Sequence, residues 1–175
     1  MNAVPFHGPK LKIARGRRHT SELAIEIAKY LKGDPWAILL QVNKETGEHR
    51  IVQKGRGKIP GDLSIIFGDA VHNFRTALDI LANDVVALGG VQPRKVYFPF
   101  GDSPTGFERQ METKMGQASA DIQAIVRGFQ PYRGGNETLR AMHDLDIGDK
   151  HIAIMSLGTS GTAANDPTVR GGSVV

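Results

Sequence analysis

Gly68-Asp69-Ala70-Val71-His72-Asn73-Phe74-Arg75-Thr76-Ala77-Leu78-Asp79 lies at the centre of the longest segment with a helical period, residues 61–89. Apolar side chains recur here at every third or fourth position, as in a helix that turns a wide face toward a protein core. The residues on this face are Phe67, Ala70, Val71, Phe74, Ala77, Leu78, Leu81, Ala82 and Val85. The sequence therefore predicts one long central helix, which the glycines at 89 and 90 end.

A second face of this predicted helix is polar. Its members lie three or four residues apart, so their side chains can reach one another or a common ligand. They are Asp69, His72, Asn73, Thr76, Asp79 and Asn83. Arg75 precedes Asp79 by four residues, which is the spacing of an ion pair on a helix. Two interpretations are open: a polar network that specifies how helices pack, or a ligand site.

A second group of ionisable residues occupies positions 143–151, at the expected end of a later helix. The segment reads His143-Asp144-Leu145-Asp146-Ile147-Gly148-Asp149-Lys150-His151. Carboxylates at a helix C-terminus oppose the helix dipole, so Asp146 and Asp149 need cationic partners. Arg75, Lys150 or the basic N-terminal helix could provide them.

The sequence contains no clear motif for a metal site, a cofactor site or a catalytic nucleophile. A metal site could be built from His72, His143 or His151 with Asp69 or Asp149, but no two histidines have close ligand spacing. The absence of cysteine excludes disulfides and thiolate ligands. No dinucleotide fingerprint or serine nucleophile motif is present either. We therefore predict no metal and no cofactor.

The charge of the chain is unevenly distributed. Residues 1–60 carry 12 Lys and Arg against 5 Asp and Glu, giving +7, whereas residues 61–175 carry 10 against 13, giving −3. The basic N-terminal region could meet RNA or an acidic partner, or could simply be a solvated helix face. No stretch reaches the roughly 20 apolar residues of a membrane span, and no export signal is recognisable. We expect a cytoplasmic protein.

Around the central helix, the sequence predicts a mostly helical α+β fold. A helix is expected at roughly 10–32, although Gly16 weakens it and Thr20 or Ser21 could cap a restart. Residues 36–42 and 48–54 have strand character and enclose a glycine-containing loop, so they predict an antiparallel β-hairpin flanking the helices.

The second half of the chain predicts three shorter helices that pack on the central one. Ser103, Ser119 and Asn136 are expected to cap them. Residues 147–157 have strand character, and these residues or 95–100 could join the hairpin. We expect residues 1–157 to form one globular domain and residues 158–175, rich in Gly, Ser and Thr, to be a poorly ordered tail.

The two polar segments together resemble a widespread group of uncharacterised bacterial proteins. Their recurring pattern is approximately GDxxHNxRxALDxL followed by a DKH segment, which this chain matches at residues 68–81 and 149–151. The sequence departs from the pattern at Ile80 and Ile152, where the group often has His and Arg. The resemblance covers about residues 10–157 and implies a soluble bacterial protein without indicating an activity.

More distantly, helices with Arg, Asn and His on their inner faces resemble HEPN-type ribonucleases of toxin and phage-defence systems. Those domains usually have a histidine four to six residues after the arginine, where Arg75 is followed by Asp79, Ile80 and Leu81. A metal-independent ribonuclease needs a base, an acid and a cation beside the phosphate. Under this resemblance the catalytic candidates are His72, Arg75 and His151. The supporting polar network comprises Asp69, Asn73, Asp79, Asp149 and Lys150.

Three functions follow from these observations. The first is a binding or accessory protein in which the polar helix face is structural or contacts a partner. The second is the HEPN-like ribonuclease, and the third is a metal-dependent hydrolase. A homodimer is also expected, because a second subunit could cover the edges of the hairpin.

Overall fold

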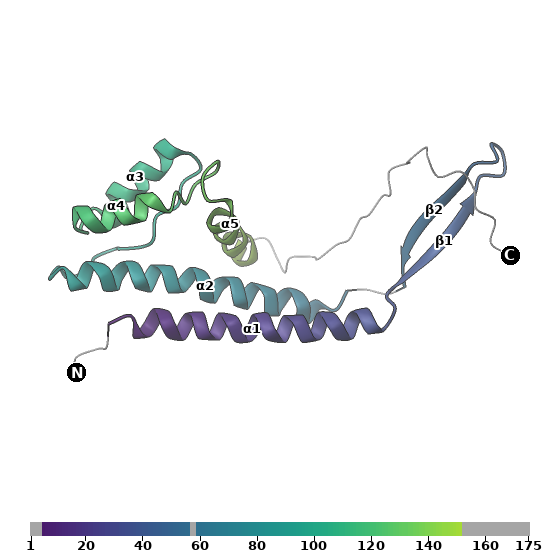
Figure 1. Cartoon of the computed structure of the whole chain (residues 1–175), viewed down its shortest axis with the longest axis horizontal. Helices are drawn as coiled ribbons and strands as arrows, with labels where there is room; N and C mark the ends of the chain where they lie inside the picture. The colour runs from purple at the N-terminus through teal and green to yellow at the C-terminus, as the bar shows by residue number, and fades with distance from the viewer. Residues whose placement is uncertain (1–4, 57–58, 152–175) are drawn as a thin grey trace.

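The computed structural model describes residues 5–56 and 59–151, the last three by their backbone alone. Within these residues the chain forms five helices and one two-stranded antiparallel sheet, which confirms the mostly helical α+β fold (Figure 1). The elements in chain order are α1 (His7–Lys32), β1 (Trp36–Val42), β2 (His49–Gly55), α2 (Gly61–Leu88), α3 (Pro104–Met115), α4 (Ala120–Gly128) and α5 (Glu137–His151).

Helices α1 and α2 form a long antiparallel pair, with α3, α4 and α5 on the side of α2 that faces away from α1 (Figure 1). Gly16 lies where the two helices approach closely, since a Cβ there would come 2.7 Å from a ring carbon of Phe74. The expected restart of α1 at Thr20 or Ser21 is wrong. The helix is continuous, and the Thr20 hydroxyl donates to the Gly16 carbonyl, 3.0 Å away, within it.

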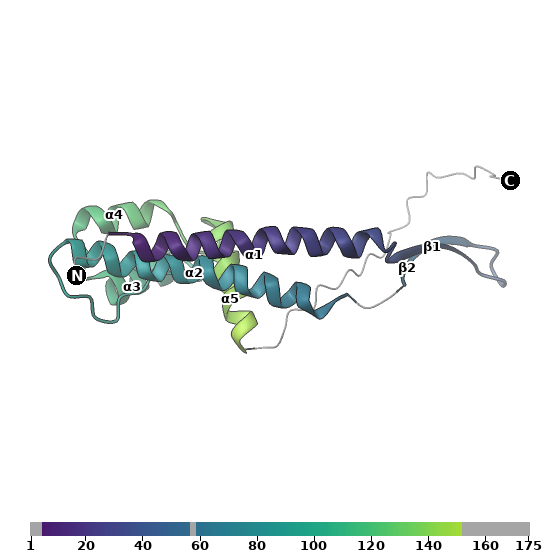
Figure 2. The ribbon, with the colours of Figure 1, turned by 90° about the horizontal axis from the view of Figure 1, so that it is seen from below.

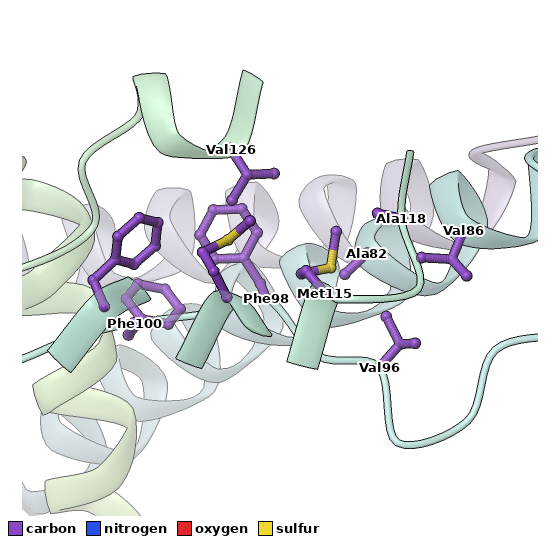
Figure 3. Packing of buried hydrophobic residues seen from close by; sticks show 10 residues of the cluster. Ala82, Val86, Val96, Phe98, Phe100, Met115, Ala118 and Val126 are labelled. Carbon is purple, nitrogen blue, oxygen red and sulfur yellow. The ribbon is translucent and has the colours of Figure 1, made fainter. Parts of the chain in front are cut away.

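The hydrophobic core lies between the C-terminal half of α2 and the segments that follow it (Figure 3). Its buried members are Ala82, Val86, Val96, Phe98, Phe100, Phe107, Met111, Met115, Ala118 and Val126. The two methionines of α3 are fully buried in it, because flexible thioether side chains fill irregular gaps well. This core fixes α3 and α4 and the loop before them on α2.

The predicted helix caps are confirmed. The Ser103 and Ser119 side chains accept from backbone N–H groups in the first turns of α3 and α4. Asn136 Oδ1 accepts from the Leu139 N–H at the start of α5. These local bonds satisfy N–H groups that have no partner within the helix, which is why the three helices begin at these residues.

Helix α5 continues where the sequence suggested a strand from residue 147. The helix runs to His151, because the inward positions Leu139, Met142 and Asp146 maintain the helical period. The expected strand therefore does not form at 147–151, and residues 152–157 lie outside the described residues. The same holds for the predicted tail, residues 158–175.

The β-hairpin extends away from the helices, beyond the end of α1 (Figures 1 and 2). Its register pairs Trp36 with Gly55 and Val42 with His49. The Asn43 side chain accepts from two backbone N–H groups of the loop, and Gly47 has the positive φ that was expected of it. Within the described residues the sheet has two strands, so residues 95–100 do not join it.

The hairpin is anchored to the helices at its base. The Tyr30 and Trp36 rings meet edge to face with centroids 6.2 Å apart, and Asp34 pairs with Arg56. None of the helices in the described part of the chain is both long and apolar enough to cross a lipid bilayer.

Gly101 provides a test of this packing. A Cβ at this position would lie 2.4 Å from the backbone nitrogen of buried Phe107, and backbone cannot move aside without shifting α3. We expect Gly101→Ala to lower the free energy of unfolding by about 2–3 kcal/mol, as overpacked cores do. Chemical denaturation would measure the change, and Gly128→Ala, where nothing lies within 4 Å, is the matched control. Equal stability of the two variants would contradict the packing argument.

Candidate functional site

Helix α5 crosses α2 near its middle and brings the two predicted polar segments together (Figures 1 and 2). We call the residues that meet there the α2–α5 cluster: His72, Arg75 and Asp79 from α2, and His143 and Asp146 from α5. Arg75 and His143 are 68 positions apart in the chain, and His72 and Asp146 are 74 positions apart.

His72 and Asp146 form the outer link of the cluster. His72 Nδ1 lies 2.9 Å from Asp146 Oδ1, and the carboxylate is buried whereas the imidazole is partly exposed. Thr76 Oγ1 is 3.4 Å from the other ring nitrogen of His72. Asp146 thus contacts α2 through His72, a partner that was not among those expected from the sequence.

Arg75 is the centre of the cluster and is only 7% exposed. Its Nε donates to His143 Nδ1 at 3.3 Å, and its Nη1 lies 2.5 Å from Asp79 Oδ1 as an ion pair, although without the alignment of a hydrogen bond. Its guanidinium carbon is 4.6 Å from the centroid of the Phe100 ring. The positive charge is therefore matched by a carboxylate, an imidazole and an aromatic face within the protein.

His143 is held as a neutral imidazole. Its ring stacks on Phe100 with centroids 4.3 Å apart and planes at 3°. Burial, followed by the charges of Arg75, Arg140 and Lys114, outweighs nearby Asp144 and lowers the His143 pKa from 6.5 to about 4. Because Nδ1 accepts from Arg75, the ring proton belongs on Nε2.

Lys114 of α3 approaches the same region. Burial lowers its pKa, and the charge of Arg75 lowers it further, while Asp79 acts in the opposite direction. The backbone N–H of Phe98 donates to Asp79 Oδ1 at 3.0 Å. Asp79 therefore links the cluster to the core segment that carries Phe98 and Phe100.

A second buried arginine, Arg140, fixes the start of α5. Its Nη1 donates to the Gly101 carbonyl at 3.0 Å, and its other nitrogens pair with Asp144 and Asp102. No sequence pattern singled out Arg140, Lys114 or Phe100 as part of the site. Their positions depend on how α3 and α5 fold back onto α2, so spacing along the chain gives no signal for them.

The predicted polar face divides between two sides of α2. Asn73 belongs to the α1 side, where its Oδ1 accepts from Lys12 Nζ at 3.3 Å and its Nδ2 donates to the Asp69 carbonyl. The exposed Asp69 side chain lines a groove of about 730 Å³ between α1 and α2, together with Arg15 and His19. Asn73 and His72 therefore have their partners on different neighbouring helices, Asn73 on α1 and His72 on α5.

The predicted catalytic residues come together only in part. His72 and Arg75 both belong to the α2–α5 cluster, and the histidine bonded to Arg75 is His143. His151 is in the last turn of α5, and its side chain, like those of Asp149 and Lys150, lies outside the described residues. Among the residues that are described, no group of three His, Asp or Glu side chains could hold a metal ion.

Comparisons of the chain with protein-family models, curated proteins and solved structures gave no match. Both resemblances drawn from sequence patterns therefore stay predictions.

Proposed function

We propose that the chain is a non-catalytic binding or accessory protein of the bacterial group with the GDxxHNxRxALDxL pattern. One observation carries this proposal: Arg75, the strongest candidate for charge chemistry, is buried and matched by Asp79, His143 and Phe100. In this proposal the α2–α5 cluster holds α5 on the central helix, and binding takes place on the outer surfaces.

Ribonuclease chemistry makes demands that the cluster meets poorly. An arginine that stabilises a phosphate has to present free N–H donors to the substrate. Arg75 is instead buried, with its Nε donating to His143 and its Nη1 within ion-pair distance of Asp79. A general acid also has to be protonated near neutral pH, whereas His143, with a pKa of about 4, is neutral there.

A HEPN-like ribonuclease is the second candidate, and a specific arrangement favours it. Arg75 is bonded to His143 of α5, and His72 precedes it by about one turn on α2. This arrangement assembles an arginine–histidine pair between helices, although the usual spacing within one helix is absent. The His72 side chain is 45% exposed, so it is accessible to a substrate.

RNA cleavage separates the two candidates. The purified full chain is incubated with mixed structured and single-stranded RNA, with EDTA or with magnesium and manganese. We expect no cleavage above background in any reaction, because the cluster does not offer a free cation and acid to a phosphate.

The matched variants for this assay are His72→Gln and Arg75→Lys, which preserve approximate size. Cleavage that survives EDTA and falls in both variants would replace the binding proposal by the ribonuclease. Cleavage that needs added metal would favour the metal-dependent hydrolase instead.

A further inference from the structure

The hairpin formed by β1 and β2 has one strongly apolar face. Residues directly opposite each other in an antiparallel pair have their side chains on the same face, so Leu40 and Ile51 lie together, with Ile38 and Val42 beside them. Their exposed fractions are 80% for Ile38, 63% for Leu40, 50% for Val42 and 66% for Ile51. We call these four residues the apolar face of the hairpin.

The two faces of the hairpin differ in charge. The side of the hairpin that carries Leu39 also carries Arg50 and Lys54. On the other side, His49 and Gln53 flank the apolar face, and there is no Lys, Arg, Asp or Glu. Burying the apolar face therefore requires no desolvation of a formal charge, whereas burying the opposite face would desolvate two cations.

The apolar face needs a cover. An isolated two-stranded hairpin is marginally stable in water, and contiguous apolar patches of this kind mark interaction sites. The hairpin extends away from the helices of its own chain, so they leave this face open in the described structure (Figures 1 and 2).

We propose that the apolar face of the hairpin is the interface with a second copy of this chain. A two-fold axis through the Leu40–Ile51 pair places this face against its own copy, as in isologous dimers. No Lys, Arg, Asp or Glu lies on this side of the hairpin, so the two copies bring no like charges together there.

The available area is consistent with a dimer. In a two-fold pair both copies contribute these four side chains, each 50–80% exposed, so that eight aliphatic side chains lose contact with water. A stable interface buries at least about 1,000 Å² in total. The register places Trp36, His49 and Gln53 on the same side of the hairpin, where they would extend such an interface.

This inference rests on the proposed binding role and names the partner as a second copy of the chain. Sedimentation velocity of the full chain across a wide concentration range tests it. We expect a species of twice the 19.0 kDa chain mass. Leu40→Glu should weaken association at least about 100-fold, because it brings like charges together at a buried contact.

The control is Leu39→Glu, the same substitution on the neighbouring residue of the opposite face, which should leave the dimer intact. Mixing Leu40→Glu with Leu40→Lys chains should restore a dimer, and this rescue shows that both variants are folded. A wild-type chain that stays monomeric would overturn the inference, as would equal loss in both glutamate variants. If the chain is monomeric and does not cleave RNA, the binding proposal still holds but the partner is not a second copy. If the chain cleaves RNA, the binding proposal is overturned and the dimer inference is not affected.

Discussion

Arg75→Ala is expected to lower the free energy of unfolding by about 3 kcal/mol, the low end of the loss when one partner of a buried ion pair is removed. The guanidinium bridges Asp79, His143 and the Phe100 ring, so its removal leaves a carboxylate without its cation and α5 without a link to α2. For a chain of this length, the melting temperature should fall by roughly 6–12 °C.

Thermal unfolding followed by circular dichroism measures this effect. Arg75→Lys should recover part of the loss, since it preserves the charge but not the planar donor group that meets His143. Arg127→Ala is the matched control, because it removes an exposed arginine paired with Glu108 and should cost less than about 1 kcal/mol. Equal melting temperatures for Arg75→Ala and Arg127→Ala would contradict an architectural role for the cluster.

His143 is expected to make the fold sensitive to acid. Its pKa is about 4 in the folded protein because burial and then the positive charges of Arg75, Arg140 and Lys114 disfavour the protonated ring. In the unfolded chain a histidine titrates near 6.5. Between these two values the unfolded state binds a proton that the folded state does not bind, so stability decreases as the pH falls.

The expected loss from this residue is up to about 3 kcal/mol between pH 6.5 and pH 4, since each step of one in pKa corresponds to about 1.4 kcal/mol. The contribution is fully present above pH 6.5, and no further loss from this group is expected below pH 4. Urea denaturation at a series of pH values would give the free energy of unfolding at each pH.

His143→Gln tests the assignment, because an amide oxygen can still accept from Arg75 but does not titrate in this range. The variant should have a flatter dependence of stability on pH than the wild type. His49→Gln, in the exposed hairpin, is the control and should retain the wild-type slope. An unchanged slope in His143→Gln would show that another group causes the acid sensitivity.

Local physical chemistry determined much of the fold from the sequence. The apolar period of residues 61–89 and the glycines that follow predicted α2 to within one residue. Ser103, Ser119 and Asn136 located three helix starts, because their side chains bond backbone groups within three positions. The hairpin loop followed likewise from the glycine between the two strand segments, since Gly47 has a positive φ in the structure. Each of these signals is contained in a few neighbouring residues.

The tertiary structure alone decided the partners of the polar residues. Arg75 and Asp79 share a helix, so their spacing indicated their pairing, but His143 is 68 positions from Arg75. The angle at which α5 crosses α2 decides which histidine contacts Arg75. The Phe100 ring, which both His143 and Arg75 contact, helps to set their positions. The packing of whole elements also decides that Asn73 contacts α1 while His72 contacts α5, and that the hairpin is exposed. No short stretch of sequence encodes this packing.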